Sequence, residues 1–222
     1  MGSKPRRRLL PKTENNQGRE WDRGTELLTL FAMTAHGILH VGTEPGDARP
    51  RPQSLILVGP PGIGKTEMLL RFRGNSTLAF RSDMTVRGLW KLLQYAEKGR
   101  VSHVVMTEFQ KTFQRKLSTA VNCIGTLAEA MDEGVFEADV GAMHWSFNGA
   151  RIAVLAGMTG RGLKRRQGML FEMGFLDRCA MLPWELPDDQ RRDVMYRISH
   201  GDRRDLARVV LPVPEKPIAV RM

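Results

Sequence analysis

The stretch LILVGPPGIGKTEMLL, Leu55 to Leu70, decides the fold. Its centre, GPPGIGKT, has every fixed position of the phosphate-binding pattern G-x-x-x-x-G-K-[ST]. An apolar run precedes the pattern and a helix-forming run follows it, which is the strand, loop and helix order that this pattern requires. The sequence therefore predicts a nucleotide-binding loop. What nucleotide binding accomplishes must come from the rest of the chain.

The residues of this loop have separate expected parts in binding phosphate. Glycines let successive backbone N–H groups turn toward phosphate oxygens, and the helix that follows contributes its positive amino end. Lys65 is expected to reach the β- and γ-phosphates of ATP, and the Thr66 hydroxyl to hold Mg²⁺. The predicted nucleotide-binding residues are Gly59, Pro60, Pro61, Gly62, Ile63, Gly64, Lys65 and Thr66.

The charge balance favours a polyanionic partner. The 222 residues include 34 Lys and Arg against 24 Asp and Glu, a formal net charge of +10. DNA or RNA is the expected partner, and solubility without a partner is the alternative. Residues 1–20 are polar and basic, so we expect a flexible arm in which Arg6, Arg7 and Arg8 tether nucleic acid.

The remaining composition indicates a cytoplasmic protein. No apolar run reaches the length of a membrane span, so no membrane partner is expected. Cys123 and Cys179 have no metal-ligand spacing and are predicted to be buried, reduced thiols.

Strand-like and helix-like segments alternate, which predicts an α/β fold with a mainly parallel sheet. A helix is expected over 25–39, with Thr25 as its cap, and others follow the phosphate loop and cover 85–99 and 116–134. Buried strands are expected over 54–59, 76–82, 102–109 and 150–160, with a hairpin over 135–149. The predicted parts are the arm, a core over 21–187, a short helical region over 188–211 and an extended tail over 212–222.

One acidic residue, Glu108, is expected at the carboxyl edge of the sheet, where ligands bind in such folds. It could orient Mg²⁺ through water or polarise the attacking water. Two alignments with an Asp-Glu pair are open: Thr107 has replaced the aspartate, or Phe109 stands in the place of the glutamate. One carboxylate is missing in either case, and Gln110 or Glu67 could compensate.

The order of these features resembles the AAA+ ATPases. GPPGIGKT resembles their Walker A motif, and VVMTE their Walker B motif. IAVLAGMTG is similar to the strand that places a sensor-1 residue, here Thr159, near the γ-phosphate. MGFLDRC is similar to the segment with an arginine finger, here Arg178, which would reach a neighbouring subunit's nucleotide. The resemblance implies a P-loop NTPase sheet, ATP and Mg²⁺ as cofactors, and a homo-oligomeric ring or filament.

The segment LAEAMDEGVFEADVGAMHWSFNGARIAVLAGM narrows the resemblance. It is similar to the group with a β-hairpin before the sensor strand, which includes enhancer-binding activators, magnesium chelatases and hexameric helicase relatives. In many members the hairpin touches DNA or a protein client. Trp145 is either a stacking residue for nucleic acid or an aromatic packed on its own sheet.

Two further segments after the sensor strand are rich in arginine. The lid after the sheet is short, and either Arg191 or Arg192 is a sensor-2 arginine or both are ordinary surface residues. RGLKRR is predicted to be a loop that binds a phosphate backbone, contacts a neighbouring subunit or is merely solvated; its candidate DNA contacts are Lys164, Arg165 and Arg166.

The leading hypothesis is a compact AAA+ ATPase that acts on DNA as a loader or regulator in replication, transposition or a mobile element. Because the Walker B pair is incomplete, a nucleotide-gated scaffold with little or no hydrolysis is the first alternative. An ATPase that remodels a protein client is the second alternative. A small-molecule kinase would not explain the hairpin or the arginine segment.

Overall fold

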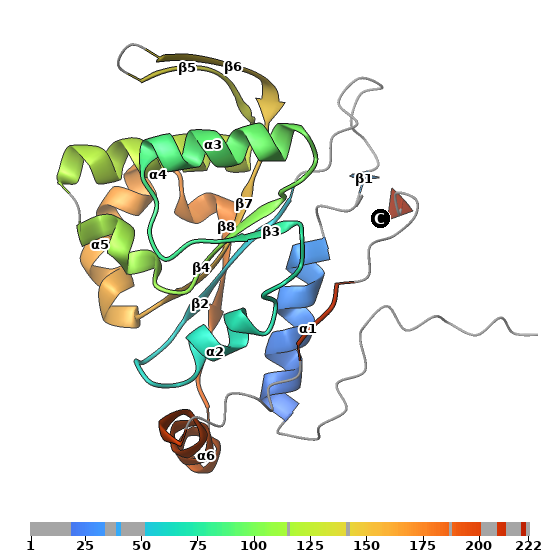
Figure 1. Cartoon of the computed structure of the whole chain (residues 1–222). Helices are drawn as coiled ribbons and strands as arrows, with labels where there is room; N and C mark the ends of the chain where they lie inside the picture. Colours follow the sequence, from blue (N-terminus) through green and yellow to red (C-terminus); the bar gives the residue numbers. More distant parts are fainter. Residues whose placement is uncertain are drawn as a thin grey trace, which may run out of the picture.

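The computed structural model describes residues 19–33, 39–40, 52–114, 116–140, 143–186, 188–200, 208–211 and 219–220 (Figure 1). The α-helices there are α1 (Arg19–Met33), α2 (Lys65–Leu70), α3 (Val86–Glu97), α4 (Leu117–Met131), α5 (Gly160–Glu172) and α6 (Asp188–Ser199). The strands are β1 (Leu39–His40), β2 (Ser54–Val58), β3 (Leu78–Phe80), β4 (His103–Met106), β5 (Val135–Val140), β6 (Met143–Ala150), β7 (Ala153–Met158), β8 (Cys179–Pro183) and β9 (Ala219–Val220). Two 3-10 helices are η2 (Phe109–Gln114) and η3 (Leu176–Arg178).

Five parallel strands form the central sheet in the order β3-β4-β7-β2-β8. The three inner strands are the runs SLILV, HVVM and AVLAGM, whose residues are almost all buried. Such continuous apolar strands are expected where helices cover both faces of a parallel sheet. The α/β class and the mainly parallel sheet between helices are therefore confirmed.

Two helical layers enclose this sheet (Figure 1). Helices α1 and α2 lie on one face with one hydrophobic core, and α3, α4 and α5 lie on the other face with a second core. The chain leaves β2 through α2, whereas it leaves the neighbouring β7 through α5. When connections leave two adjacent parallel strands on opposite faces, a crevice opens at the carboxyl ends of those strands. The fold therefore places a crevice after Val58 and Met158.

The predicted hairpin is the antiparallel pair β5–β6, which lies at the other end of the molecule (Figure 1). It joins the sheet at the amino end of β7, so it projects away from the crevice. Trp145 stacks on Phe147 with ring centroids 6.4 Å apart, and Phe147 stacks on Trp90 of α3 at 5.9 Å. This row of three aromatic rings attaches the hairpin to α3.

The predicted helix start at Thr25 is wrong. Helix α1 begins at Arg19, and Thr25 is buried inside it. The Thr25 hydroxyl donates to the Met68 sulfur at 3.4 Å and accepts a hydrogen bond from Arg71. Both partners follow the loop between β2 and α2. Thr25 therefore serves helix packing, and its suitability as a cap misled the sequence-based boundary.

Several elements were not expected from periodicity. The segment RGLKRR, predicted to be a loop, forms the first turns of α5. Strand β8 is a half-exposed edge strand of mixed sequence, CAMLP, which gives neither an apolar run nor a clear alternation. In the predicted tail, β9 pairs in parallel with β1.

The two cysteines are free thiols in different surroundings. Cys123 is fully buried in α4, as predicted. Cys179 begins β8 and is half-buried, and burial raises the pKa of its thiol to about 12. Separately, none of the helices within the described ranges is long and apolar enough to cross a membrane.

Candidate functional site

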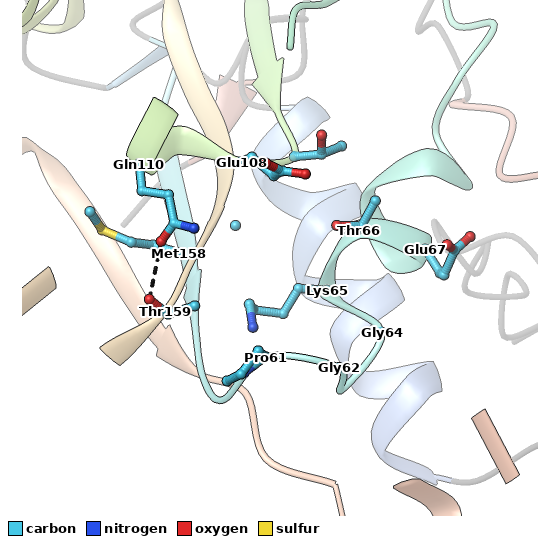
Figure 2. Close-up of a pocket in the computed structure, with 12 residues that line it drawn as sticks. Pro61, Gly62, Gly64, Lys65, Thr66, Glu67, Glu108, Gln110, Met158 and Thr159 are labelled. Carbon is cyan, nitrogen blue, oxygen red and sulfur yellow. Dashed lines mark hydrogen bonds between the residues drawn. The ribbon is translucent and has the colours of Figure 1, made fainter. Parts of the chain in front are cut away.

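A pocket of about 260 Å³ occupies the crevice at the carboxyl edge of the sheet. It is formed by the loop after β2, the turn after β4 and the end of β7. Figure 2 shows Lys65, Gln110 and Thr159 arranged around one space, with Thr66 and Glu108 beside it. The lining residues are Pro61, Gly62, Gly64, Lys65, Thr66, Glu67, Thr107, Glu108, Gln110, Gly157, Met158 and Thr159.

The loop between β2 and α2 depends on two left-handed glycines. Gly62 and Gly64 have φ angles of 74° and 77°, a region that residues with a Cβ rarely adopt. Lys65 begins α2 and is only 8% exposed. Its ammonium group donates to the carbonyl oxygens of Gly59, at 2.9 Å, and of Pro60, and burial lowers the pKa of Lys65. The loop thus curls around a partly desolvated cation.

Trp184, which follows β8, holds this loop in place. Its indole N–H donates to the Ile63 carbonyl at 3.1 Å, and its backbone N–H donates to Val58 at 2.7 Å. A Cβ at Gly59 would overlap the Trp184 carbonyl oxygen, so the loop passes as close to this residue as a backbone allows. Sequence reasoning missed Trp184, although an aromatic residue in LPWELP, between two Leu-Pro pairs, was a usable signal.

The acidic element consists of Glu108 alone on the turn after β4. Its carboxylate is half-exposed and forms an ion pair with Lys111 at 2.8 Å. Phe109 is completely buried and stacks on Phe175 with centroids 5.3 Å apart, whereas Thr107 borders the pocket. In both alignments considered from the sequence, the residue beside Glu108 therefore supplies no second carboxylate. Glu67 is close by, but its side chain points away from Lys65 and Thr159 (Figure 2).

Thr159 lies at the pocket and caps the helix that follows it. Its hydroxyl accepts a hydrogen bond from the Gly162 backbone N–H at 3.0 Å, which caps α5. The same hydroxyl donates to Gln110 Oε1 at 3.1 Å. Gln110 thereby lies in the pocket beside Thr159, a hydrogen-bond partner that its predicted part as a substitute for the missing carboxylate did not include.

Arg178 lies at the amino edge of the sheet, outside the pocket. It belongs to η3, immediately before β8, and donates to the Gly174 carbonyl at 2.7 Å. Its guanidinium also forms an ion pair with Asp132 at 3.1 Å. On α6, Arg191 and Arg192 are exposed and do not line the pocket, whereas Met195 lies beside Gly62 of the loop.

The candidate nucleic-acid contacts are distributed over the molecule. Arg6, Arg7 and Arg8 lie outside the described residues. On α5, Lys164 and Arg165 are exposed, whereas Arg166 is half-buried and donates to the Phe113 carbonyl at 3.2 Å.

The hairpin is a less suitable surface for DNA. The stacking of Trp145 on Phe147 favours the interpretation of Trp145 as an aromatic packed on its own sheet. The exposed charged side chains of β5 are Glu137 and Asp139, which would repel a phosphate backbone. His144 pairs with Asp139 at 2.8 Å, and this hydrogen bond raises the pKa of His144.

Comparison with known proteins does not assign the chain to a family. No protein-family model matches it, and no curated protein matches it at a significant level. The chemistry of the pocket therefore carries the functional argument.

Proposed function

We propose that this chain is a P-loop ATPase of the AAA+ type, with its nucleotide in the pocket at the carboxyl edge. The observation that carries the proposal is the convergence of three separate segments on that pocket: Lys65 and Thr66 after β2, Glu108 after β4, and Thr159 after β7. Because β7 lies between β2 and β4, Thr159 is held between the loop and the acidic turn. This is the arrangement that the resemblance to AAA+ proteins implies for a sensor residue.

The loop fits a phosphate group. The ammonium of Lys65 is partly buried and bonds to loop carbonyls, which phosphate oxygens can replace with a stronger, charge-assisted bond. A volume of about 260 Å³ is below the roughly 300 Å³ at which whole-ligand pockets begin. The pocket therefore suits the phosphate chain, with the nucleoside outside it.

The residues present also fit Mg²⁺, because hard oxygen donors are its usual ligands. The Thr66 hydroxyl would hold it directly, and Glu108 would hold it through water. The ion would supply charge neutralisation for the phosphates. Its affinity is expected to be modest, since the pocket has one acidic turn residue and Lys111 competes for that carboxylate.

Glu108 is the residue that can activate water for hydrolysis. Its carboxylate would accept a proton as the water oxygen bonds to the γ-phosphorus and the bond to the β–γ bridging oxygen breaks, which gives ADP and phosphate. The second candidate function, a nucleotide-gated scaffold with little turnover, is favoured by the single carboxylate on the turn after β4 and its ion pair with Lys111.

The place of Arg178 supports a shared site. It lies at the opposite edge of the sheet from the pocket, so it is suited to a neighbouring copy's nucleotide and not to its own. We therefore propose a homo-oligomer, a ring or a filament, in which a neighbour's phosphate competes with Asp132 for this guanidinium.

DNA is the proposed client, and loading or regulation in replication, transposition or a mobile element is the proposed role. The support is the net charge of +10 together with exposed Lys164 and Arg165 on α5. A protein client remains the alternative partner, and the acidic outer face of the hairpin is the surface it would use.

The test measures ATP hydrolysis with and without double-stranded DNA while assembly size is followed. Lys65→Ala and Arg178→Ala should each abolish turnover, whereas Arg100→Ala, an exposed arginine after α3, should leave it unchanged. Mixing the two inactive variants should restore part of the activity, because some interfaces then combine an intact Lys65 with an intact Arg178. No restoration would contradict shared sites, and assembly on ATP without turnover would establish the scaffold.

A further inference from the structure

The hydroxyl of Thr159 forms two hydrogen bonds, one as acceptor and one as donor. It accepts from the Gly162 N–H at 3.0 Å and gives its proton to Gln110 Oε1 at 3.1 Å. A threonine hydroxyl has one proton to donate. While this network is intact, Thr159 therefore has no donor left for a phosphate in the pocket.

The network fixes the orientation of Gln110. Because its carboxamide oxygen accepts from Thr159, its NH2 group is turned the other way, into the pocket that Gln110 lines. Figure 2 shows this nitrogen on the side of the pocket space, opposite the loop. The NH2 group forms no hydrogen bond with another described residue, so both of its donors are available to a ligand.

The surroundings hold Gln110 in this position. It follows Phe109 in η2, and Phe109 is completely buried between Phe113 and Phe175. A Cβ at position 162 would lie 2.9 Å from both Gln110 Oε1 and Thr159 Oγ1. Glycine at this position therefore leaves room for the hydrogen-bonded pair.

We infer that Gln110 is the residue that binds the terminal phosphate of a nucleoside triphosphate, with Thr159 as its positioning residue. The inference rests on the proposed function, since it assigns a ligand contact in the same pocket. The loop and Lys65 would surround the phosphates nearest to the loop. Gln110 reaches the pocket from the opposite wall. Its amide would therefore contact the phosphate that extends farthest from the loop, which ATP has and ADP lacks.

The experiment measures dissociation constants of the full chain for ADP and for a non-hydrolysable ATP analogue, both with Mg²⁺. In Gln110→Ala the analogue should bind about tenfold or more weakly, because a hydrogen bond to a charged group is lost. ADP affinity should stay within about twofold of the wild type, and it also shows that the variant is folded. Gln110→Glu should weaken the analogue further, because a carboxylate repels phosphate.

Variants of the supporting residues distinguish positioning from direct contact. Thr159→Val and Gly162→Ala should each reproduce the selective loss, and Thr159→Ser should not. Combining Thr159→Val with Gln110→Ala should add little to either alone, since the two residues act as one unit. Weaker analogue binding in Thr159→Val without weaker analogue binding in Gln110→Ala would overturn the inference. An equal loss of ADP and analogue affinity in Gln110→Ala would overturn it as well. If the wild type bound neither nucleotide, the proposed function itself would fail.

Discussion

The two edges of the central sheet hold their charged side chains in different ways. At the carboxyl edge, Lys65 donates to carbonyls of its own loop, and Glu108 pairs with Lys111 one turn away. At the amino edge, Arg178 bonds to Asp132, which follows α4, and to Gly174, which follows α5.

Arginine also links separate elements elsewhere at the amino edge. Arg151, between the hairpin and β7, donates to the carbonyl oxygens of Asp132, at 3.0 Å, and Glu133, at 3.2 Å, after α4. The contacts that Lys65 and Glu108 make at the carboxyl edge are local, and a ligand can replace them. The contacts of the arginines at the amino edge connect the segments after α4, before β7 and before β8, and no pocket residue takes part in them. The two edges should therefore respond differently to substitution.

The largest effect is expected for Trp184→Ala. Trp184 is 4% exposed, and its loss removes a large buried side chain together with the bond to Ile63. The free energy of unfolding should fall by about 3–5 kcal/mol, and nucleotide binding should be lost as well. Chemical denaturation and a nucleotide titration measure both quantities. Trp145→Ala removes the same kind of side chain from the half-exposed hairpin, so it should cost less and leave nucleotide affinity intact. Equal effects of the two substitutions on nucleotide affinity would show that Trp184 does not hold the loop.

A smaller effect at the carboxyl edge is expected for Gly59→Ala. The new methyl group would overlap the backbone oxygen of Trp184, which cannot rotate away. Unfolding free energy should fall by about 1–3 kcal/mol, with weakened nucleotide binding. Gly160→Ala is the matched control, because a Cβ there meets nothing within 4 Å. A Gly59→Ala variant as stable as this control would show that the loop is not held tightly by Trp184.

At the amino edge, Asp132→Asn should have a modest effect. The ion pair with Arg178 is partly exposed, with Arg178 30% and Asp132 40% accessible, so its loss should cost no more than about 1 kcal/mol. Nucleotide affinity of the monomer should not change, because the pair lies away from the pocket. Asp177→Asn, an exposed acid next to Arg178, serves as the reference in the same denaturation series. A changed monomer affinity in Asp132→Asn alone would show that the edges are coupled.

The smallest effect concerns pH at the hairpin. The hydrogen bond that the His144 ring donates to the Asp139 carboxylate raises the folded-state pKa of His144, so the stabilisation from this pair is complete below the unfolded-state pKa. It is lost as the pH rises through the folded-state pKa. An NMR titration should place the pKa of His144 lower in Asp139→Asn than in the wild type. Identical titration curves would show that the pair does not form in solution.

The sequence predicted the carboxyl edge better than the amino edge, for physical reasons. The sequence predicts that the loop with Lys65, and also Glu108, lie at the carboxyl edge. Each follows a continuous apolar strand, and parallel strands bring the residues that follow them to one edge. Strand β8 was missed because an edge strand is only half buried and its sequence shows no regular pattern.

The hydrogen-bond partners were beyond sequence reasoning. Thr159 was predicted at the pocket, but nothing in one sequence shows that its proton goes to Gln110. Likewise, Trp184 contacts Ile63 only because β8 lies beside β2. The two residues are far apart along the chain, so their contact cannot be inferred from local sequence.

The surroundings of the two cysteines determine how this chain can be labelled. Thiol reagents attack the thiolate, and at neutral pH Cys179, with a pKa of about 12, has almost none, while Cys123 is fully buried. A cysteine introduced by Ser146→Cys on the exposed face of the hairpin would therefore react far faster than either native thiol. A fluorophore at that position can therefore be used to test the proposed homo-oligomer by energy transfer between copies, without removal of the native cysteines.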